Sequence, residues 1–293
     1  MACFELEAGH FRLFQRFRSG NLGRMSTVAI IGGGKIGEAL VAGLISGGMN
    51  PKKIHVANRR SERSQELKEQ YCIVPFNDNA QAVDGVDVVF LCVKPNVLVK
   101  VADEIAEAVD NNDSTIVVSM AAGVTNASIE EVMAAGTPVL RVMPNTPMLV
   151  GKGTSAIAPG RFSDEESIEQ VRKLLQTVGA VEVIAESDMD AVIAMSGSSP
   201  AYLFLFVESM IDAGVQLGLK REVAKKLAIN SIYGAAAMLQ ETDEEPAQLR
   251  GNVCSPGGTT IAAVRSLEES GLRGMMYRAT EAAAKRNAEM SKQ

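Results

Sequence analysis

Val28-Ala-Ile-Ile-Gly-Gly-Gly-Lys-Ile-Gly37 is the stretch that decides the fold. Its first four residues are apolar and mostly β-branched, which is typical of a strand buried on both faces. Gly32, Gly34 and Gly37 follow at the G-x-G-x-x-G spacing, and the apolar residues after them recur at helical intervals. Between a strand and a helix, such glycines favour a site where a pyrophosphate meets backbone N–H groups at the helix N-terminus. The alternative is a glycine-rich turn that binds nothing.

Length and charge limit the classes of protein to consider. A chain of 293 residues can form two domains with a substantial core. A formal net charge of −6 argues against nucleic acid, whose phosphates require a basic surface. No uninterrupted apolar run reaches the roughly 18 residues of a membrane span. We therefore expect neither a nucleic-acid nor a membrane partner.

Cysteine and histidine limit the chemistry. The 4 cysteines are scattered without a CxxC pair, which indicates a reducing cytoplasm and no structural disulfide or zinc site. Cys92 lies in a predicted buried strand and reads as a small core residue. The 2 histidines, His10 and His55, both lie early in the chain. A Ser-His-Asp triad or a histidine metal site in the second half is therefore excluded, so chemistry there must use hydroxyls, backbone amides or groups of the ligand.

Residues 1–24 differ in character from the rest, with several phenylalanines and arginines before Met25. We interpret them as a vector leader or an upstream start. A transit peptide fits less well because of Glu5 and Glu7, and a basic membrane-surface helix is a weaker alternative. The expected domains are then residues 25–185, which bind a dinucleotide, and residues 186–293, which are helical.

Strands alternate with helices through the first of these domains. This order predicts an α/β fold with a parallel, right-handed, doubly wound sheet of the Rossmann type. The predicted strands are residues 28–31, 53–57, 73–74, 86–93, 115–119 and 139–143, with 153–158 and 181–184 extending the sheet. In such sheets ligands bind beyond the carboxyl ends of the strands. The small residues 121–123 lie at one of these ends, where they would let a nicotinamide ribose approach the backbone.

The end of the second predicted strand favours NADPH over NADH. An Asp or Glu there would accept hydrogen bonds from a ribose 2′-hydroxyl and repel a 2′-phosphate. The chain instead has Asn58-Arg59-Arg60, whose two guanidinium groups can hold a phosphate through charge-assisted hydrogen bonds. The alternative is a solvated pair of arginines at a helix start.

The second predicted domain is helical to its end, with helices over 188–195, 200–217, 221–240, 259–268 and 273–290. Residues 201–211 are apolar nearly all round, so this helix should be buried on every side. A single helical domain of about a hundred residues is too small to bury one helix on every side. We therefore predict an obligate dimer formed through residues 186–293.

Gly251-Asn-Val-Cys-Ser-Pro-Gly-Gly-Thr-Thr260 interrupts these helices. The segment Ser255–Gly258 cannot lie within a helix, and the two threonines open a new one. Freed backbone amides beside a helix N-terminus suit a small carboxylate. The alternative is an ordinary helix cap with a Pro-Gly turn.

Taken together, these motifs resemble the Δ1-pyrroline-5-carboxylate reductase family, whose members catalyse the last step of proline biosynthesis. The resemblance runs from Met25 to the C-terminus. It depends on Gly32–Gly37, Val93-Lys-Pro95, Ser119-Met-Ala-Ala-Gly123, Arg141-Val-Met-Pro-Asn-Thr-Pro147, Ser196-Gly-Ser-Ser-Pro-Ala-Tyr202 and Ser255-Pro-Gly-Gly-Thr-Thr260. The last three are specific to this family rather than to dinucleotide folds at large.

The resemblance implies the site residues. Expected cofactor contacts are Gly32, Gly33, Gly34, Lys35, Ile36, Gly37, Asn58, Arg59, Asn77, Cys92, Val93, Lys94, Pro95, Ala121, Ala122 and Gly123. Expected contacts to L-1-pyrroline-5-carboxylate are Glu186, Asn252, Val253, Ser255, Gly257, Gly258, Thr259 and Thr260. Thr260 matches a hydroxyl that hydrogen-bonds the ring nitrogen. The resemblance also implies that the substrate lies against the helical domain of a dimer partner, in an assembly that often grows to a decamer.

The implied reaction agrees with the scarcity of histidine. Hydride passes from the nicotinamide to the cyclic imine carbon, and solvent can protonate the nitrogen, so the site mainly orients the two carbons. Lys94 is the other ionisable candidate, although a cofactor-positioning or capping role fits it better than proton donation. The competing interpretations are another NADPH-dependent imine or β-hydroxyacid reductase, and a dinucleotide-sensing protein without turnover.

Overall fold

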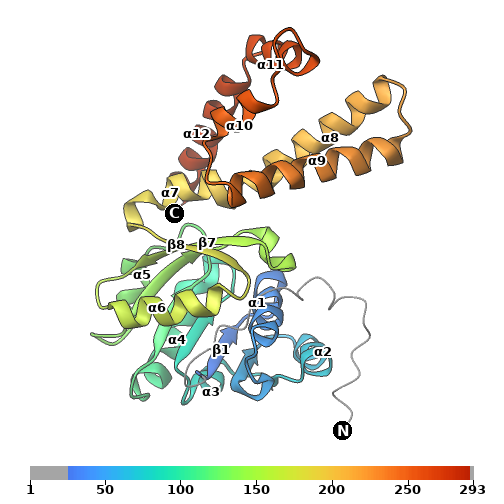
Figure 1. Cartoon of the computed structure of the whole chain (residues 1–293). Helices are drawn as coiled ribbons and strands as arrows, with labels where there is room; N and C mark the ends of the chain where they lie inside the picture. Colours follow the sequence, from blue (N-terminus) through green and yellow to red (C-terminus); the bar gives the residue numbers. More distant parts are fainter. Residues whose placement is uncertain (1–25, 291–293) are drawn as a thin grey trace. The chain divides into compact units, whose positions relative to one another are not determined.

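The structure is a computed structural model that describes residues 26–290 (Figure 1). The predicted leader, residues 1–24, lies outside the described residues. The described chain forms two compact units. The first contains the chain up to Gly197 together with the residues from Ala283 on, and the second is Ser198–Ala282.

The first unit is built on an 8-stranded sheet with the order β3-β2-β1-β4-β5-β6-β7-β8. Its strands are β1 (Val28–Ile31), β2 (Ile54–Ala57), β3 (Val74–Phe76), β4 (Val88–Leu91), β5 (Ile116–Ser119), β6 (Val139–Met143), β7 (Gly153–Pro159) and β8 (Gly179–Val183). The chain runs outward from β1 to β3, then returns past β1 to β4. The carboxyl ends of β1 and β4 are therefore the switch point where such sheets bind their ligands.

One strand pair departs from the predicted parallel sheet. β7 pairs antiparallel with β6, and all other neighbours in the sheet are parallel. The link from β6 to β7 contains only the short 3₁₀ helix η3 (Thr146–Val150). A parallel return needs a crossover of about a dozen residues or more. The direct link therefore reverses the strand, and the prediction of a wholly parallel sheet is wrong at this edge.

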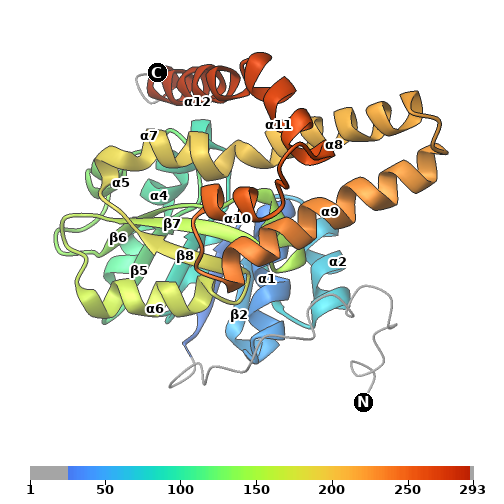
Figure 2. The ribbon, with the colours of Figure 1, turned by 45° about the horizontal axis from the view of Figure 1, so that its top comes forward.

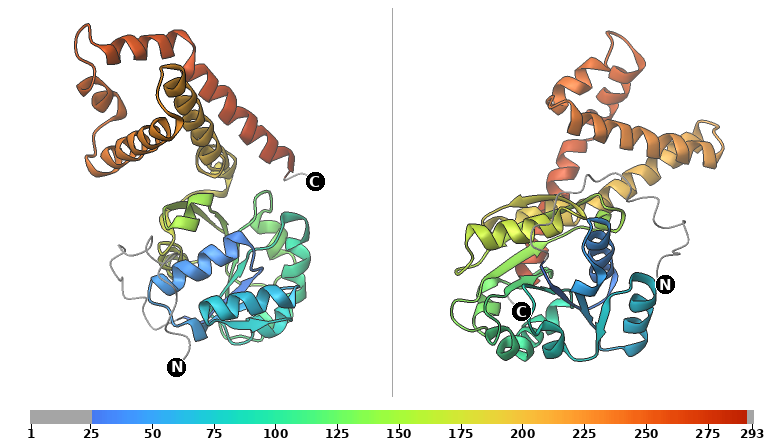
Figure 3. Two further views of the ribbon diagram at one scale, coloured as in Figure 1. Left: turned by 90° about the vertical axis from the view of Figure 1, so that its right-hand side faces the viewer. Right: turned by 60° about the horizontal axis from the view of Figure 1, so that its bottom comes forward.

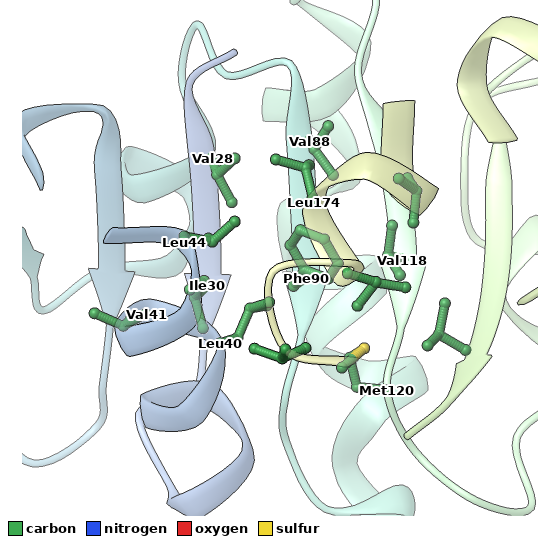
Figure 4. Packing of buried hydrophobic residues seen from close by; sticks show 14 of the residues in the cluster. Val28, Ile30, Leu40, Val41, Leu44, Val88, Phe90, Val118, Met120 and Leu174 are labelled. Atoms are coloured by element: carbon green, nitrogen blue, oxygen red, sulfur yellow. The ribbon is translucent and has the colours of Figure 1, made fainter. Parts of the chain in front are cut away.

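Helices cover both faces of the sheet (Figure 3). They are α1 (Lys35–Ser46), α2 (Ser61–Tyr71), α3 (Asn79–Val83), α4 (Pro95–Asp110), α5 (Asn126–Glu130) and α6 (Glu165–Leu175), with the 3₁₀ turn η2 (Pro51–Lys53) before β2. Leu40 and Leu44 of α1 pack with Ile30 and Phe90 on one face, where Leu174 of α6 joins them (Figure 4). The opposite face buries apolar residues of α3, α4 and α5. These two apolar layers hold the carboxyl ends of the strands rigidly in place.

The second unit is helical. It follows η4 (Glu186–Asp188), α7 (Met189–Val192) and the π-helical turn η5 (Ile193–Gly197) of the first unit. Its helices are α8 (Ser199–Gln216), α9 (Arg221–Glu241), α10 (Pro246–Asn252), α11 (Thr259–Glu269) and the part of α12 (Leu272–Met290) before Ala283. α8 and α9 pack side by side (Figure 2). A Cβ at Gly214 of α8 would lie 3.0 Å from the Cβ of Ala224 in α9, so the small residue permits this close packing. Helices α3 and α10 were not predicted from the sequence.

The apolar face of α8 is exposed in the single chain. Phe204 is 69% and Leu205 is 64% exposed, and Leu227 and Tyr233 of α9 are also more than half exposed. By length and mean hydropathy alone, Glu186–Gln216 is also one helical stretch long enough to cross a membrane, although only 17% of its apolar window is buried. The sequence has no uninterrupted apolar run of that length, but the mean hydropathy over the window tolerates the few polar residues that interrupt it.

Candidate active site

The glycine-rich turn lies directly after β1 and before α1. Gly32 has a φ of +105°, a conformation that L side chains rarely adopt, and its N–H donates to the Ala57 carbonyl at 2.9 Å. A Cβ there would lie 2.7 Å from the Cys92 carbonyl oxygen. A Cβ at Gly37 would overlap the Gly32 carbonyl oxygen, whereas one at Gly34 would meet nothing within 4 Å. Two of the glycines thus serve the turn itself, and Gly34 borders open space.

Strand register brings the other predicted residues to the same edge. Ile31, Ala57 and Leu91 stand level in neighbouring strands, and Leu91 pairs with Ser119. The ladder continues one residue further, since the Cys92 N–H donates to Ile31 at 2.8 Å and the Met120 N–H donates to Leu91 at 3.1 Å. Four predicted parts of the site therefore follow strands that end at one edge of the sheet. They are the glycine-rich turn, Asn58, Cys92–Pro95 and the segment from Ala121 to Gly123.

Asn58 contacts the glycine-rich turn directly. Its Oδ1 accepts the Gly33 N–H at 2.7 Å, while its Nδ2 is buried without a hydrogen-bond partner. A buried donor without a partner costs free energy unless a ligand or water satisfies it. The open space at Gly34, the N–H groups at the start of α1 and this orphaned donor together fit the phosphate and ribose of a dinucleotide.

Arg59 and Arg60 follow Asn58 and are exposed. Within residues 26–290 neither is held in an ion pair, so both guanidinium groups can reach a phosphate. Asn77 is also exposed, after β3. Lys35 is exposed and Ile36 half-buried at the start of α1.

The segment after β4 opens helix α4. Cys92 lies one residue beyond the strand rather than within it and packs against the core. Burial raises the pKa of the Cys92 thiol to about 12, so it remains protonated and unreactive at neutral pH. Lys94 is the exposed N-cap residue of α4 and makes no side-chain cap hydrogen bond, and Pro95 occupies the first helical position. The lysine side chain is thus turned to solvent at this edge.

Ala121, Ala122 and Gly123 form the turn after β5. Ala121 is buried, and the other two are half-buried. Their side chains are small, which would let a ligand approach the half-buried pair Ala122 and Gly123 closely.

Glu186 belongs to a partly buried polar contact in the first unit. Its Oε1 accepts the Asn126 N–H at 2.8 Å and Nη1 of Arg141 at 3.3 Å. Arg141 of β6 is 4% exposed, and its Nη2 has no hydrogen-bond partner. Glu186 therefore ties η4 to β6 and to the first turn of α5, a structural task that its sequence position did not indicate.

The predicted substrate loop lies in the second unit. Gly258 is the N-cap residue of α11, which begins with Thr259 and Thr260 as predicted. The Gly258 N–H donates to the Ser255 carbonyl at 3.0 Å, and Gly257 has a φ of +67°. Asn252 ends α10, and its Nδ2 donates to Glu244 at 3.2 Å. Val253 is exposed beside it. The first N–H groups of an 11-residue helix thus open beside two hydroxyls.

Two side chains that sequence reasoning missed hold the site together. Asn145 of the Arg141–Pro147 motif accepts the Thr154 N–H at 2.8 Å, and its Nδ2 donates to the Ser196 carbonyl at 3.1 Å. It therefore links the two family motifs. Arg63 of α2 donates to the Gly33 carbonyl at 2.9 Å. The motif itself could have pointed to Asn145, but nothing in the polar helix distinguishes Arg63 from its neighbours.

Comparison with known proteins gives two family matches. Residues 27–123 match the family described as NADP oxidoreductase coenzyme F420-dependent, and residues 186–290 match pyrroline-5-carboxylate reductase dimerisation. A pyrroline-5-carboxylate reductase of Corynebacterium melassecola is 60% identical over 92% of this chain and 100% of its own length. That of Mycobacterium leprae is 42% identical over 92% of this chain and 98% of its own length.

Solved structures agree. The pyrroline-5-carboxylate reductase of Coxiella burnetii superposes with a TM-score of 0.88 and 36% identity, covering 92% of this chain and 100% of that one. The pyrroline carboxylate reductase of Plasmodium falciparum, solved with NADP bound, superposes with a TM-score of 0.80 and 28% identity, covering 91% and 98%.

An NADP-binding domain followed by a dimerisation domain makes the chain an oxidoreductase that uses a nicotinamide cofactor. Identity of 60% over the full length of the Corynebacterium melassecola enzyme then shows which family of oxidoreductases this is. The chain belongs to the pyrroline-5-carboxylate reductase family. The predictions of family, Rossmann-type fold, enzyme class and NADP as cofactor are confirmed.

Proposed function

We propose that the chain reduces L-1-pyrroline-5-carboxylate to L-proline with NADPH, in the cytoplasm. The observation that carries this proposal is the 60% identity to a pyrroline-5-carboxylate reductase over 92% of the chain, together with family matches that include the glycine-rich turn and the Ser255–Thr260 loop. When bound, NADPH supplies the hydride that forms the new C–H bond at the imine carbon, while the imine nitrogen gains a proton and NADP⁺ remains.

In the proposed cofactor site, the turn from Gly32 to Gly37 holds the pyrophosphate with the N–H groups of α1. Asn58, Arg59 and Asn77 line the adenosine side. The carboxyl ends of β4 and β5, from Cys92 to Pro95 and from Ala121 to Gly123, line the nicotinamide side. The shared edge of the parallel strands supports this division, because the segments after β1, β4 and β5 all follow strands that end at that edge.

The loop at the start of α11 is the proposed substrate site. Its backbone N–H groups would hold the substrate carboxylate, with Asn252, Val253, Ser255, Gly257, Gly258 and Thr259 around the ring. Thr260 would place its hydroxyl against the ring nitrogen. Glu186 is retained as an acidic residue near the substrate, although its carboxylate is already bound to Arg141. Orientation of the two reacting carbons is the main service of such a site, worth several kcal/mol.

The proposed assembly is a homodimer formed through residues 186–293, with cofactor and substrate sites supplied by different protomers. The exposed apolar residues of α8 and α9 support it. Decamers built from such dimers are the extension that the resemblance implies. The free thiols of Cys92 and Cys254 are consistent with a reducing compartment.

A spectrophotometric assay tests the function. We expect loss of NADPH absorbance with racemic pyrroline-5-carboxylate, and slower loss with NADH. If the protein binds NADPH but no absorbance is lost with either cofactor, a sensor without turnover becomes the better interpretation. Turnover of other cyclic imines or β-hydroxyacids in place of this substrate would favour the rival reductase.

A further inference from the structure

Arg63 in the first turn of α2 contacts the glycine-rich turn, and all three nitrogens of its guanidinium group are used. Nε donates to the Gly33 carbonyl at 2.9 Å, Nη1 donates to Glu66 at 3.0 Å, and Nη2 forms an ion pair with Glu38. The side chain is 21% exposed. Unlike Arg59 and Arg60, this arginine is held on all three nitrogens by groups of the protein, so its side chain is fixed in place before a phosphate arrives.

The contact with Gly33 has a geometric consequence. The Gly33 C=O and the Gly34 N–H belong to one planar trans peptide, in which they point in opposite directions. Fixing the carbonyl toward α2 therefore fixes the Gly34 N–H toward the opposite side. The Gly33 N–H is held at the same time by Asn58 Oδ1 at 2.7 Å. Both peptide groups flanking Gly33 are thus oriented before any ligand arrives.

The contact with Glu38 has an electrostatic consequence. Glu38 lies in the first turn of α1, the helix end whose N–H groups face the proposed pyrophosphate. An uncompensated carboxylate there would repel a phosphate. Arg63 pairs with it, and the Tyr71 hydroxyl donates to its other oxygen at 3.2 Å. Burial, assisted by Glu38, raises the pKa of Tyr71 to about 12, so this donor keeps its proton at neutral pH.

We propose that Arg63 is a positioning residue of the cofactor site: it aims the Gly34 amide at the pyrophosphate through the Gly33 carbonyl and cancels the charge of Glu38. The inference depends on the proposed function, since it assumes that a dinucleotide occupies the turn. It predicts an effect on the pyrophosphate, which NADPH and NADH share, and none on the 2′-phosphate that distinguishes them.

The test is direct titration of Arg63→Met with NADPH and with NADH, without substrate. We expect Kd to rise about tenfold or more for both cofactors by a similar factor, while KM for the substrate stays within about twofold. Glu38→Gln combined with Arg63→Met should recover several-fold of the affinity, because the uncompensated carboxylate is gone. Arg63→Lys, which keeps the charge but not the fork, should fall between wild type and Arg63→Met. Arg172→Met is the matched control, since Arg172 pairs with Glu169 on α6 at 3.5 Å.

Two results would overturn the inference. They are an unchanged Kd in Arg63→Met, whether or not its melting temperature falls, and a loss of affinity confined to NADPH, which would make Arg63 a direct ligand of the 2′-phosphate. If Arg63→Met does not fold, the Kd values of Arg63→Lys and of the double variant for NADPH and NADH are compared with those of the wild type instead. A wild-type protein that binds neither cofactor would instead overturn the proposed function, so the two failures are distinguishable.

Discussion

Thr260 is the residue on which the proposed chemistry can be tested most directly. It lies in the first turn of α11, beside the amides of the Gly258 cap. Because solvent can protonate a cyclic imine, its hydroxyl should assist the reaction without being indispensable. We expect Thr260→Ala to lower kcat by about 10- to 100-fold, which corresponds to the loss of one hydrogen bond to a charged group. Complete loss of turnover in a folded variant would show that the hydroxyl has a greater role. Thr280→Ala, whose hydroxyl bonds the Met276 carbonyl, is the control.

Arg59 and Arg60 should determine the choice between the two nicotinamide cofactors. Charge-assisted hydrogen bonds contribute about 1.5–3 kcal/mol each, which corresponds to roughly tenfold or more in affinity. We expect Arg59→Ala combined with Arg60→Ala to raise KM for NADPH by at least about tenfold and to leave KM for NADH within about twofold. Lys52→Ala with Lys53→Ala removes the same charge from the opposite end of β2 and should change neither value. Equal losses for both cofactors would contradict a role at the 2′-phosphate.

At the scale of elements, substitutions in the glycine-rich turn should distinguish residues needed for folding from residues needed for cofactor binding. Gly37→Ala forces a Cβ against the Gly32 carbonyl, and we expect it to reduce the free energy of unfolding by about 1–3 kcal/mol. Gly34→Ala meets no protein atom within 4 Å, at a φ of −73° that alanine adopts readily. It should therefore unfold like the wild type, yet bind NADPH at least about tenfold more weakly if the pyrophosphate approaches there. Thermal unfolding and fluorescence titration measure the two effects. An unchanged Kd for NADPH in Gly34→Ala would show that the pyrophosphate does not lie against this turn.

The contact between α1 and α2 gives a pH dependence. Tyr71 ionises in the folded protein at about pH 12, above its ordinary pKa of about 10. Between these values the folded state holds more protons than the unfolded state, so the contribution of Tyr71 to stability is complete below pH 10 and is lost as the pH rises toward 12. Chemical unfolding at pH 9 and pH 11 should show a larger loss for the wild type than for Tyr71→Phe. Parallel losses in both proteins would contradict the raised pKa.

The local sequence pattern predicted the helices and strands whose apolar residues recur at a clear period. It failed where the structure depends on residues distant in the sequence. The run Val28–Ile31 and its glycines specify strand, turn and helix within ten residues. The reversal of β7 depends instead on the length of one link, and α3 is too short to show a period. In the site, the end of the second predicted strand indicated Asn58 and the family resemblance indicated Thr260. Arg63 and the Arg141–Glu186 pair became visible only through contacts between segments far apart in the chain.

For the whole molecule, the exposed apolar residues of the helical unit must be accounted for. Phe204, Leu205 and Leu217 of the α8 region are each more than 60% exposed, and Tyr233 and Tyr277 are 67% exposed. Monomeric proteins rarely leave such patches uncovered. Residues 186–290 match a dimerisation domain, so we infer that a second copy of the chain covers these apolar residues. In such a dimer α8, which belongs to the stretch with the length and hydropathy of a membrane span, would lie in the interface.

Charge placed on this face should therefore separate the subunits. Phe204→Asp combined with Leu205→Asp alters side chains that the single chain leaves exposed, so it should cost the isolated unit little while burying two carboxylates in the dimer. We expect sedimentation velocity to give a dimer or larger assembly for the wild type and a shift to monomer in the variant. Turnover should fall at least about tenfold, because in the proposed dimer the cofactor and substrate sites come from different protomers. Phe162→Asp, on a 38% exposed phenylalanine before α6, is the matched control and should stay assembled and active. A wild-type chain that sediments as a folded, active monomer would contradict the shared site.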